Sequence, residues 1–172
     1  MSDTLPILYV PAPVLRAKAR PIGAGDDVRA LSERMLATMY AAPGIGLAAP
    51  QVGEALRLVV LDVSAKDAPP APMVLVNPEV VAASHELATR EEGCLSLPGM
   101  YADVTRPFVV KVRYQALDGS KQEIEGEGLL SACLQHEIDH LNGVLFVDYL
   151  SPLKRNMILR KLAKELKLKE RD

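Results

Sequence analysis

The sequence predicts an α+β fold in which antiparallel sheets pack around one central helix and a further helix ends the chain. Three observations predict it. Apolar residues recur at helical spacing in one segment before residue 44 and in two segments after residue 128. Between these segments lie short apolar or alternating runs that are typical of strands. The Asp118-Gly119 pair between two such runs indicates a hairpin, so those strands should run antiparallel.

Length and composition favour one ordinary domain, residues 1–172, which needs no disulfide to fold. The core must be aliphatic, because the chain has no Trp and only two Phe. The net charge of -2 gives no reason to expect DNA or a membrane as a partner. The first ten residues do not resemble a signal peptide, and no run approaches ~18 apolar residues. We therefore expect a cytoplasmic protein whose two cysteines are reduced.

The first half of the chain should contain one helix, one glycine-rich loop and one buried strand. Asp26 or Asp27 is a suitable N-cap for the helix, and Pro43 and Gly44 end it. Its apolar stripe consists of Val28, Leu31, Met35 and Met39. After it come the loop Gly44–Gln51, a strand from Leu56 to Val63 and an exposed, proline-rich loop from Ala65 to Pro72.

The second half should contain the remaining strands and then two helices. The predicted strands are Met73–Asn77, Val80–Ala83, Phe108–Leu117 and Gln122–Glu127. From Leu129 to Leu141 the apolar period becomes helical, and Asn142-Gly143 ends that helix. A last helix runs from about Pro152 to about Lys169. Its apolar stripe of Ile158, Leu162 and Leu166 should dock on the body of the protein.

The strongest chemical signal is His136-Glu137-Ile138-Asp139-His140 on the Leu129–Leu141 helix. Histidines four residues apart lie one turn apart on the same helix face, so both imidazoles can bind one metal ion. Glu137, next to the first of them, is placed to move protons for a bound water. A five-residue pattern also recurs by chance on polar helix faces, so its surroundings matter.

A catalytic site of this kind needs a third protein ligand. No histidine follows His140, and the candidates before it are His85, Cys94 and Cys133. Cys133 lies ~10 Å of helix rise from His140, too far for its short side chain, and we interpret it as a small apolar residue beside the site. His85, in a polar stretch, is interpreted as a surface residue. Cys94 follows Gly93, which allows close approach of the backbone, and precedes a Pro98-Gly99 turn that should end its strand. Taken alone, Cys94 is better interpreted as a buried free thiol than as a ligand.

Three segments, in order, resemble the peptide deformylase family in its bacterial form. They are Gly44-Ile45-Gly46-Leu47-Ala48-Ala49-Pro50-Gln51, Glu92-Gly93-Cys94-Leu95-Ser96 and Gln135-His136-Glu137-Ile138-Asp139-His140-Leu141-Asn142-Gly143. The similarity extends from about Leu5 to the final helix. The resemblance implies a metal-dependent hydrolase that removes the formyl group from the N-terminal formylmethionine of new proteins and releases formate.

The resemblance also implies the residues of the site. Cys94, His136 and His140 would bind the metal, with iron(II) as the native ion and zinc, nickel or cobalt as substitutes. Glu137 would be the catalytic acid and base, and Gln51 and the Leu95 N–H would stabilise the developing oxyanion. Residues implied to contact or support the substrate are Ile45, Gly46, Glu92 (paired with Arg106), Gly93, Leu129, Ala132 and Cys133. Tyr101 stands where many bacterial members have Arg, which concerns peptide preference and not the chemistry.

Two other functions compete with this interpretation. A general metalloprotease would use the same helix motif but normally has its third ligand downstream. A non-enzymatic ribosome-binding module would not need the complete set of catalytic residues. Residues 151–172 contain eight basic and three acidic residues, a net charge of +5 that leaves the remainder at -7. Since the implied substrate is a nascent chain, this basic C-terminal helix suggests contact with the ribosome.

Overall fold

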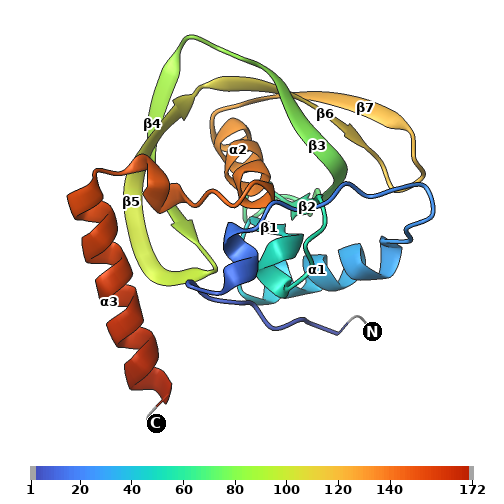
Figure 1. Ribbon diagram of the computed structural model, residues 1–172. Coiled ribbons are helices and arrows are strands. Elements are labelled where there is room, and N and C mark those ends of the chain that lie inside the picture. The colour runs from blue at the N-terminus through green and yellow to red at the C-terminus, as the bar shows by residue number, and fades with distance from the viewer. Residues whose placement is uncertain (1–2, 171–172) are drawn as a thin grey trace.

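Two antiparallel sheets and one helix make up the centre of the protein (Figure 1). The structure is a computed structural model and describes residues 3–170. The larger sheet has the strand order β1-β2-β3-β6-β7, and the smaller one pairs β4 with β5. The strands are β1 Gly46–Ala48, β2 Leu58–Leu61, β3 Met73–Ala83, β4 Leu87–Cys94, β5 Leu97–Pro107, β6 Val109–Gln115 and β7 Lys121–Glu127. All pairs are antiparallel, so the predicted fold class is confirmed.

Helix α2 (Leu129–Leu141) lies between the two sheets, and its bounds are the predicted ones. In Figure 1 it is surrounded by β3, β6 and β7 on one side and by β4 and β5 on the other. Its apolar face, which includes Leu134, Ile138 and Leu141, packs on inward-facing residues of the large sheet. Because nine of its thirteen residues are buried, the polar side chains among them have to find partners inside the protein.

Helix α1 (Arg29–Ala41) covers the other face of the large sheet and forms a second core with it. Met35 and Met39 of the predicted stripe are fully buried there. Asp27 accepts a hydrogen bond of 3.1 Å from the Arg29 N–H, whereas Asp26 instead binds Gly23 and Arg20. The N-cap itself is Val28, so neither predicted residue is the cap, and Asp27 only binds the first helical N–H from the position before it.

The structure corrects the strand predictions in three places. The predicted loop Gly44–Gln51 contains the short strand β1, and the 3₁₀ turn η2 (Ala49–Val52) begins in it. Met73–Asn77 and Val80–Ala83 are one strand, β3, interrupted by register shifts near Asn77, whose φ is 51°. The β4–β5 hairpin is not predicted from the sequence, and the predicted Pro98-Gly99 turn is wrong, because both residues lie inside β5. The chain reverses at Leu95-Ser96, directly after Cys94. β4 escaped notice because Glu92 is its only buried residue, so it has no apolar alternation.

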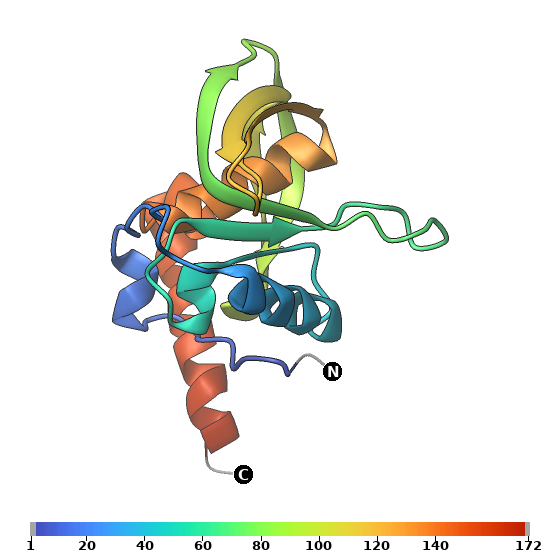
Figure 2. The same cartoon turned by 90° about the vertical axis from the view of Figure 1, so that its right-hand side faces the viewer.

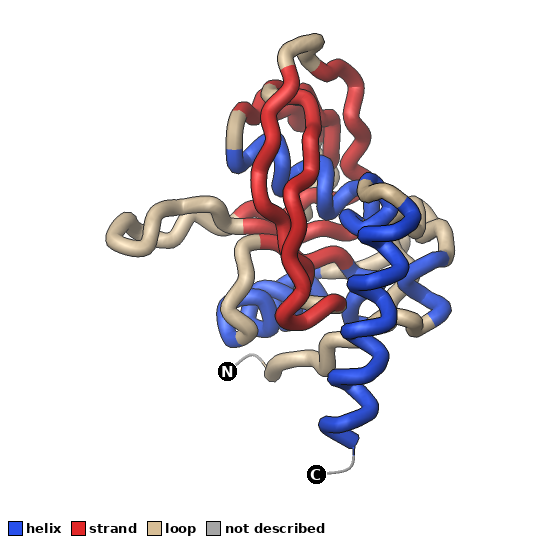
Figure 3. The backbone as a smooth tube through the Cα atoms, turned by 90° about the vertical axis from the view of Figure 1, so that its left-hand side faces the viewer, coloured by secondary structure: helices blue, strands red, loops and turns tan. Residues whose placement is uncertain are grey.

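Helix α3 (Pro152–Glu170) packs along the small sheet and then extends beyond the body (Figures 1 and 3). Leu162 is buried, and Ile158 and Leu166 are half-buried, against a cluster that contains Leu97 and Phe146, so the predicted docking stripe is confirmed. The short 3₁₀ turn η3 (Phe146–Tyr149) links α2 to this helix. The predicted exposed loop between β2 and β3 projects from the body (Figure 2). Among residues 3–170, no helix is both long and apolar enough to cross a membrane.

Candidate metal centre

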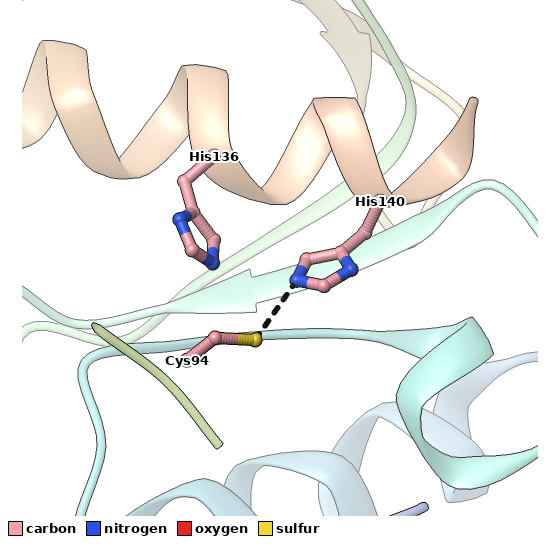
Figure 4. Close-up of side chains that lie close together, drawn as sticks. All are labelled: Cys94, His136 and His140. Carbon is pink, nitrogen blue, oxygen red and sulfur yellow. Dashed lines mark hydrogen bonds between the residues drawn. The ribbon is translucent and has the colours of Figure 1, made fainter. Parts of the chain in front are cut away.

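Three potential metal ligands meet between α2 and the β4–β5 hairpin. Helical spacing places His136 and His140 on one face of α2, with ring centroids 5.0 Å apart. Cys94 ends β4, and its Sγ lies 3.3 Å from Nε2 of His140. One ligand atom from each of the three residues lies within 4.8 Å of the others. Figure 4 shows the thiol pointing toward the space between the two imidazoles. The pair of histidines and the cysteine are therefore arranged to share one ion.

The donor set and its surroundings fit a transition metal. Thiolate and imidazole are the ligands that iron, zinc and related ions take in proteins. His140 is buried, and its Nδ1 has no hydrogen-bond partner among the described residues. Burial lowers the pKa of His140 well below its ordinary value, which keeps this imidazole neutral, as a ligand must be.

The orientation of His136 is fixed by a buried ion pair. Its Nδ1 lies 3.0 Å from Oε1 of Glu92, so Nε2 is the nitrogen left to face the metal site. Arg106 donates to both oxygens of the same carboxylate, at 2.6 and 2.9 Å. Although burial raises the pKa of Glu92, the hydrogen bonds from His136 and Arg106 outweigh it and hold this pKa at about 2. Glu92 is therefore a charged acceptor at neutral pH.

Glu137 lies beside the three ligands in a confined position. Burial raises the pKa of Glu137 to about 7, and its Oε1 has no hydrogen-bond partner among residues 3–170. A Cβ added to Gly46 would lie 2.5 Å from Oε2 of this carboxylate and 3.0 Å from the Cys133 sulfur. The glycine is needed because the carboxylate occupies the space where a side chain would be.

The amide of Gln51 has a defined orientation. Its Oε1 accepts a hydrogen bond of 2.9 Å from the Ala48 N–H, which can only donate, so the NH₂ group must point the other way. That NH₂ lies 3.1 Å from the Ser96 hydroxyl and 3.5 Å from the Cys94 sulfur. A neutral donor is thus held next to the metal site.

These groups lie at the wall of a cavity of about 750 Å³. It is lined by all the residues that the sequence assigns to the site except His140 and Arg106: Ile45, Gly46, Gln51, Glu92, Gly93, Cys94, Leu95, Leu129, Ala132, Cys133, His136 and Glu137. Sequence reasoning missed further lining residues, which are Ile7, Tyr9, Ala42, Pro43, Gly44, Arg90, Glu91, Pro98 and Gly99. The N-terminal ones carried no signal, because a proline-containing extended segment has no period to indicate which side faces a cavity.

The other residues weighed as ligands lie outside the group. Cys133 is buried on α2, its thiol lies 3.8 Å from the Ile45 carbonyl oxygen, and burial raises its pKa well above the ordinary value. His85 is exposed in the connection between β3 and β4.

Tyr101 borders the cavity with 63% of its surface exposed, and its ring lies where a Gly93 side chain would be.

Comparisons with known proteins agree with this site. The sequence model of the family described as polypeptide deformylase matches residues 4–156. The peptide deformylase of Mesorhizobium japonicum is 52% identical over 160 residues, which are 92% of this chain and 91% of the relative. That of Rhizobium meliloti is 52% identical over 94% of both chains.

Solved structures give the same result. The crystal structure of a peptide deformylase from Legionella pneumophila superposes with a TM-score of 0.91 at 48% identity, over 99% of both chains. The Ehrlichia chaffeensis enzyme in complex with actinonin has a TM-score of 0.89 at 38% identity, over 95% of this chain and 98% of that one. The chain therefore belongs to the polypeptide deformylase family.

Proposed function

We propose that this protein hydrolyses the formamide bond of N-formylmethionyl peptides and releases formate and a free amino terminus. The observation that carries the proposal is that Cys94, His136 and His140 form one group of ligands, and that Cys94 and His136 line one cavity together with Glu137 and Gln51. The cavity takes residues from the N-terminal segment, from the loop before β1, from β4 and from α2. Because no part of the chain forms it alone, we further propose that residues 1–172 act as one domain.

Cys94, His136 and His140 would hold the metal in this proposal. When bound, the metal supplies Lewis acidity and makes water nucleophilic at neutral pH. We propose iron(II) as the native ion, with zinc, nickel or cobalt as substitutes, since a thiolate and two imidazoles suit all four. The Glu92 carboxylate, itself held by Arg106, would keep His136 oriented with Nε2 toward the ion.

Glu137 would act as the acid and base. It would take a proton from the attacking water and return it to the leaving amine, which requires a group that exchanges protons near neutral pH. A pKa of about 7, raised by burial, suits this role. The Gln51 NH₂ and the Leu95 N–H would donate hydrogen bonds to the formyl oxygen as charge develops on it. Both are neutral, so they stabilise the oxyanion without opposing the metal's charge.

The apolar part of the cavity would accept the methionine side chain, since Ile45, Leu129, Ala132 and Cys133 line it. Gly46 and Gly93 would lie against the peptide backbone. We further propose that the protein works in the cytoplasm, where newly made chains carry the formyl group.

The direct test measures formate release from formyl-Met-Ala-Ser. Acetyl-Met-Ala-Ser and an unformylated peptide of similar length serve as controls for the formyl group and for cleavage of internal bonds. Rapid formate release with no cleavage of either control is expected. Cleavage of internal peptide bonds would instead support a general metalloprotease.

The identity of the metal predicts sensitivity to air. We expect the iron(II) form to lose activity faster than the nickel form, because a thiolate beside a redox-active ion is open to stepwise, partly irreversible oxidation. Cys94 lines the cavity and is only half-buried, so oxidants can reach it. The measurement is residual deformylation over time in air, with mass spectrometry of the peptide that contains Cys94. Equal lifetimes of the two forms would contradict an iron–thiolate site.

We propose the ribosome as a second partner of this protein, bound through α3. Within the described part of the chain, Lys161, Lys164, Lys167 and Lys169 are all exposed on this helix. Arg171 and Asp172, which also belong to the basic C-terminal segment, lie outside the described residues. Because α3 extends beyond the body, RNA phosphates can approach its basic side chains from several directions (Figure 2).

Reversing those four charges to Glu should weaken co-sedimentation with ribosomes by roughly tenfold or more, and the parent's binding should fall steeply with salt. A matched control changes four exposed cations elsewhere, Lys18, Arg29, Lys66 and Lys121, to Glu. The control variant should bind ribosomes more strongly than the α3 variant does. Both variants should deformylate formyl-Met-Ala-Ser at the parental rate. If the two variants bind ribosomes equally, net charge and not α3 is responsible.

A further inference from the structure

A continuous set of hydrogen bonds runs from His136 to the exposed face of η3. It begins with His136 Nδ1, which is 3.0 Å from Oε1 of Glu92. The Arg106 Nε and Nη2 atoms bind the two oxygens of that carboxylate. Arg106 and Glu92 are 4% and 8% exposed, so each is a buried charge that depends on the other. The orientation of the imidazole therefore depends on where the guanidinium is held.

The opposite side of Arg106 is held by two residues that have had no role so far. Its Nη1 donates to Oδ2 of Asp139 at 2.9 Å. The Tyr149 hydroxyl donates to the same oxygen at 2.6 Å. The guanidinium also stacks on the Tyr149 ring, with Cζ 4.6 Å from the ring centroid. Asp139 thus holds the guanidinium at Nη1 and Tyr149 covers its face, while Glu92 binds it at Nε and Nη2.

The same turn also reaches the metal ligand directly. Phe146 begins η3, is buried, and stacks on the His136 ring with centroids 6.3 Å apart and an interplanar angle of 20°. Tyr149 ends the turn and is 49% exposed. Two residues of η3, Phe146 and Tyr149, therefore contact the two ends of the path from Arg106 to His136.

We infer that Asp139 and Tyr149 are positioning residues of the metal centre, which act on His136 through Arg106 and Glu92. The inference rests on the proposed function, since it takes Cys94, His136 and His140 as the metal ligands. Tyr149 fixes the carboxylate of Asp139 and the plane of Arg106. Arg106 in turn holds Glu92 in the place where it orients His136 and increases its basicity as a ligand.

The competing explanation is that the cluster only fastens η3 and β5 to α2. If the cluster had only this structural role, substitutions in it would change the melting temperature but not the properties of the bound metal. Two properties of the metal separate the explanations: the rate at which a chelator removes cobalt(II), and the visible absorption spectrum of the cobalt(II)-loaded protein. The spectrum reports the geometry and strength of the ligands and does not depend on turnover.

The test compares Tyr149→Phe, which removes only the hydroxyl, with Asp139→Asn, which removes the charge opposite Arg106. Substituting a direct partner of a metal ligand typically costs 10- to 100-fold in metal affinity or activity. Because these residues act at one or two steps further away, we expect cobalt loss to be about 3-fold faster in Tyr149→Phe and about 10-fold faster in Asp139→Asn. Both variants should show a shifted cobalt spectrum.

The chain offers a matched control in Tyr40→Phe. Tyr40 is 45% exposed and its hydroxyl also donates to Oδ2 of an aspartate, Asp62, at 2.6 Å. That pair ties α1 to the loop after β2, and Asp62 also accepts hydrogen bonds from the backbone N–H groups of Ser64 and Ala71. The control loses the same type of bond at the same exposure, and its cobalt spectrum and cobalt loss should equal those of the parent.

Parental cobalt spectra and parental loss rates in Tyr149→Phe and Asp139→Asn would overturn the inference, whatever happens to their melting temperatures. Equal acceleration in Tyr40→Phe would also overturn it, because the effect would then be general loosening. If Asp139→Asn does not fold, the pair Tyr149→Phe and Tyr149→Leu decides alone, with the larger effect expected from Leu, which removes the ring as well. A parent that binds no stoichiometric cobalt would instead refute the metal centre itself.

Discussion

Replacing Cys94 with alanine is expected to abolish stoichiometric metal binding and to reduce deformylation to the detection limit. The substitution removes the only thiol among the three clustered ligand atoms and leaves two imidazoles from one helix. Two protein ligands are fewer than catalytic sites of this type use. The measurements are metal content per chain, by elemental analysis of anaerobically purified protein, and formate release from formyl-Met-Ala-Ser.

The chain provides its own control for this experiment, because Cys133 is the other cysteine. It lines the same cavity but lies outside the ligand group. Cys133→Ala should keep its metal and its kcat, and raise KM because the wall of the cavity changes shape. A Cys94→Ala protein with a full complement of metal and near-parental turnover would contradict the assignment of Cys94 as a ligand.

Glu137→Gln is expected to keep the metal and to lower kcat by roughly 10²- to 10⁴-fold, the range that general acid–base groups contribute. Glutamine has nearly the same shape, so the close packing against Gly46 is preserved. It cannot carry a proton between water and the leaving amine. Single-turnover kinetics with formyl-Met-Ala-Ser and metal analysis of the same sample measure both effects.

A matched control for this substitution is Glu91→Gln. Glu91 also lines the cavity, but it is exposed on β4. Within residues 3–170, its side chain makes no hydrogen bond to a proposed metal ligand. Its kcat should stay within a few-fold of the parent. A Glu137→Gln enzyme that turns over as fast as Glu91→Gln would remove Glu137 from the mechanism.

The parts that sequence predicted well are those whose apolar pattern has one clear period. Helix α2 is the best case, since its buried face is periodic and Asn142-Gly143 marks its end. The pair of histidines follows from the same helix geometry. The third ligand is harder to predict, because spacing alone does not distinguish a metal ligand from a buried free thiol at Cys94. Only the resemblance of its segment to a family singled it out before the structure placed it beside His140.

The β4–β5 hairpin could not be predicted for a physical reason. Its buried charged residues are Glu92 and Arg106, a pair that a hydrophobic pattern counts as solvent-exposed. The pair can be buried because each charge satisfies the other and because Asp139 and His136 complete their hydrogen bonds. Similarly, β3 was read as two strands because Asn77 and Pro78 interrupt its pattern, although the chain continues through them.

The ligands come from two different layers, with Cys94 on the hairpin and both histidines on α2. A bound ion therefore works as a crosslink between them and contributes to folding as well as to chemistry. At a free metal concentration one thousand times the Kd, metal binding adds about 4.1 kcal/mol to the free energy of unfolding. Once its thiolate is oxidised, the protein loses this tie at the same time as its activity. We then expect the hairpin to open locally and proteases to cleave the oxidised protein faster than the intact one.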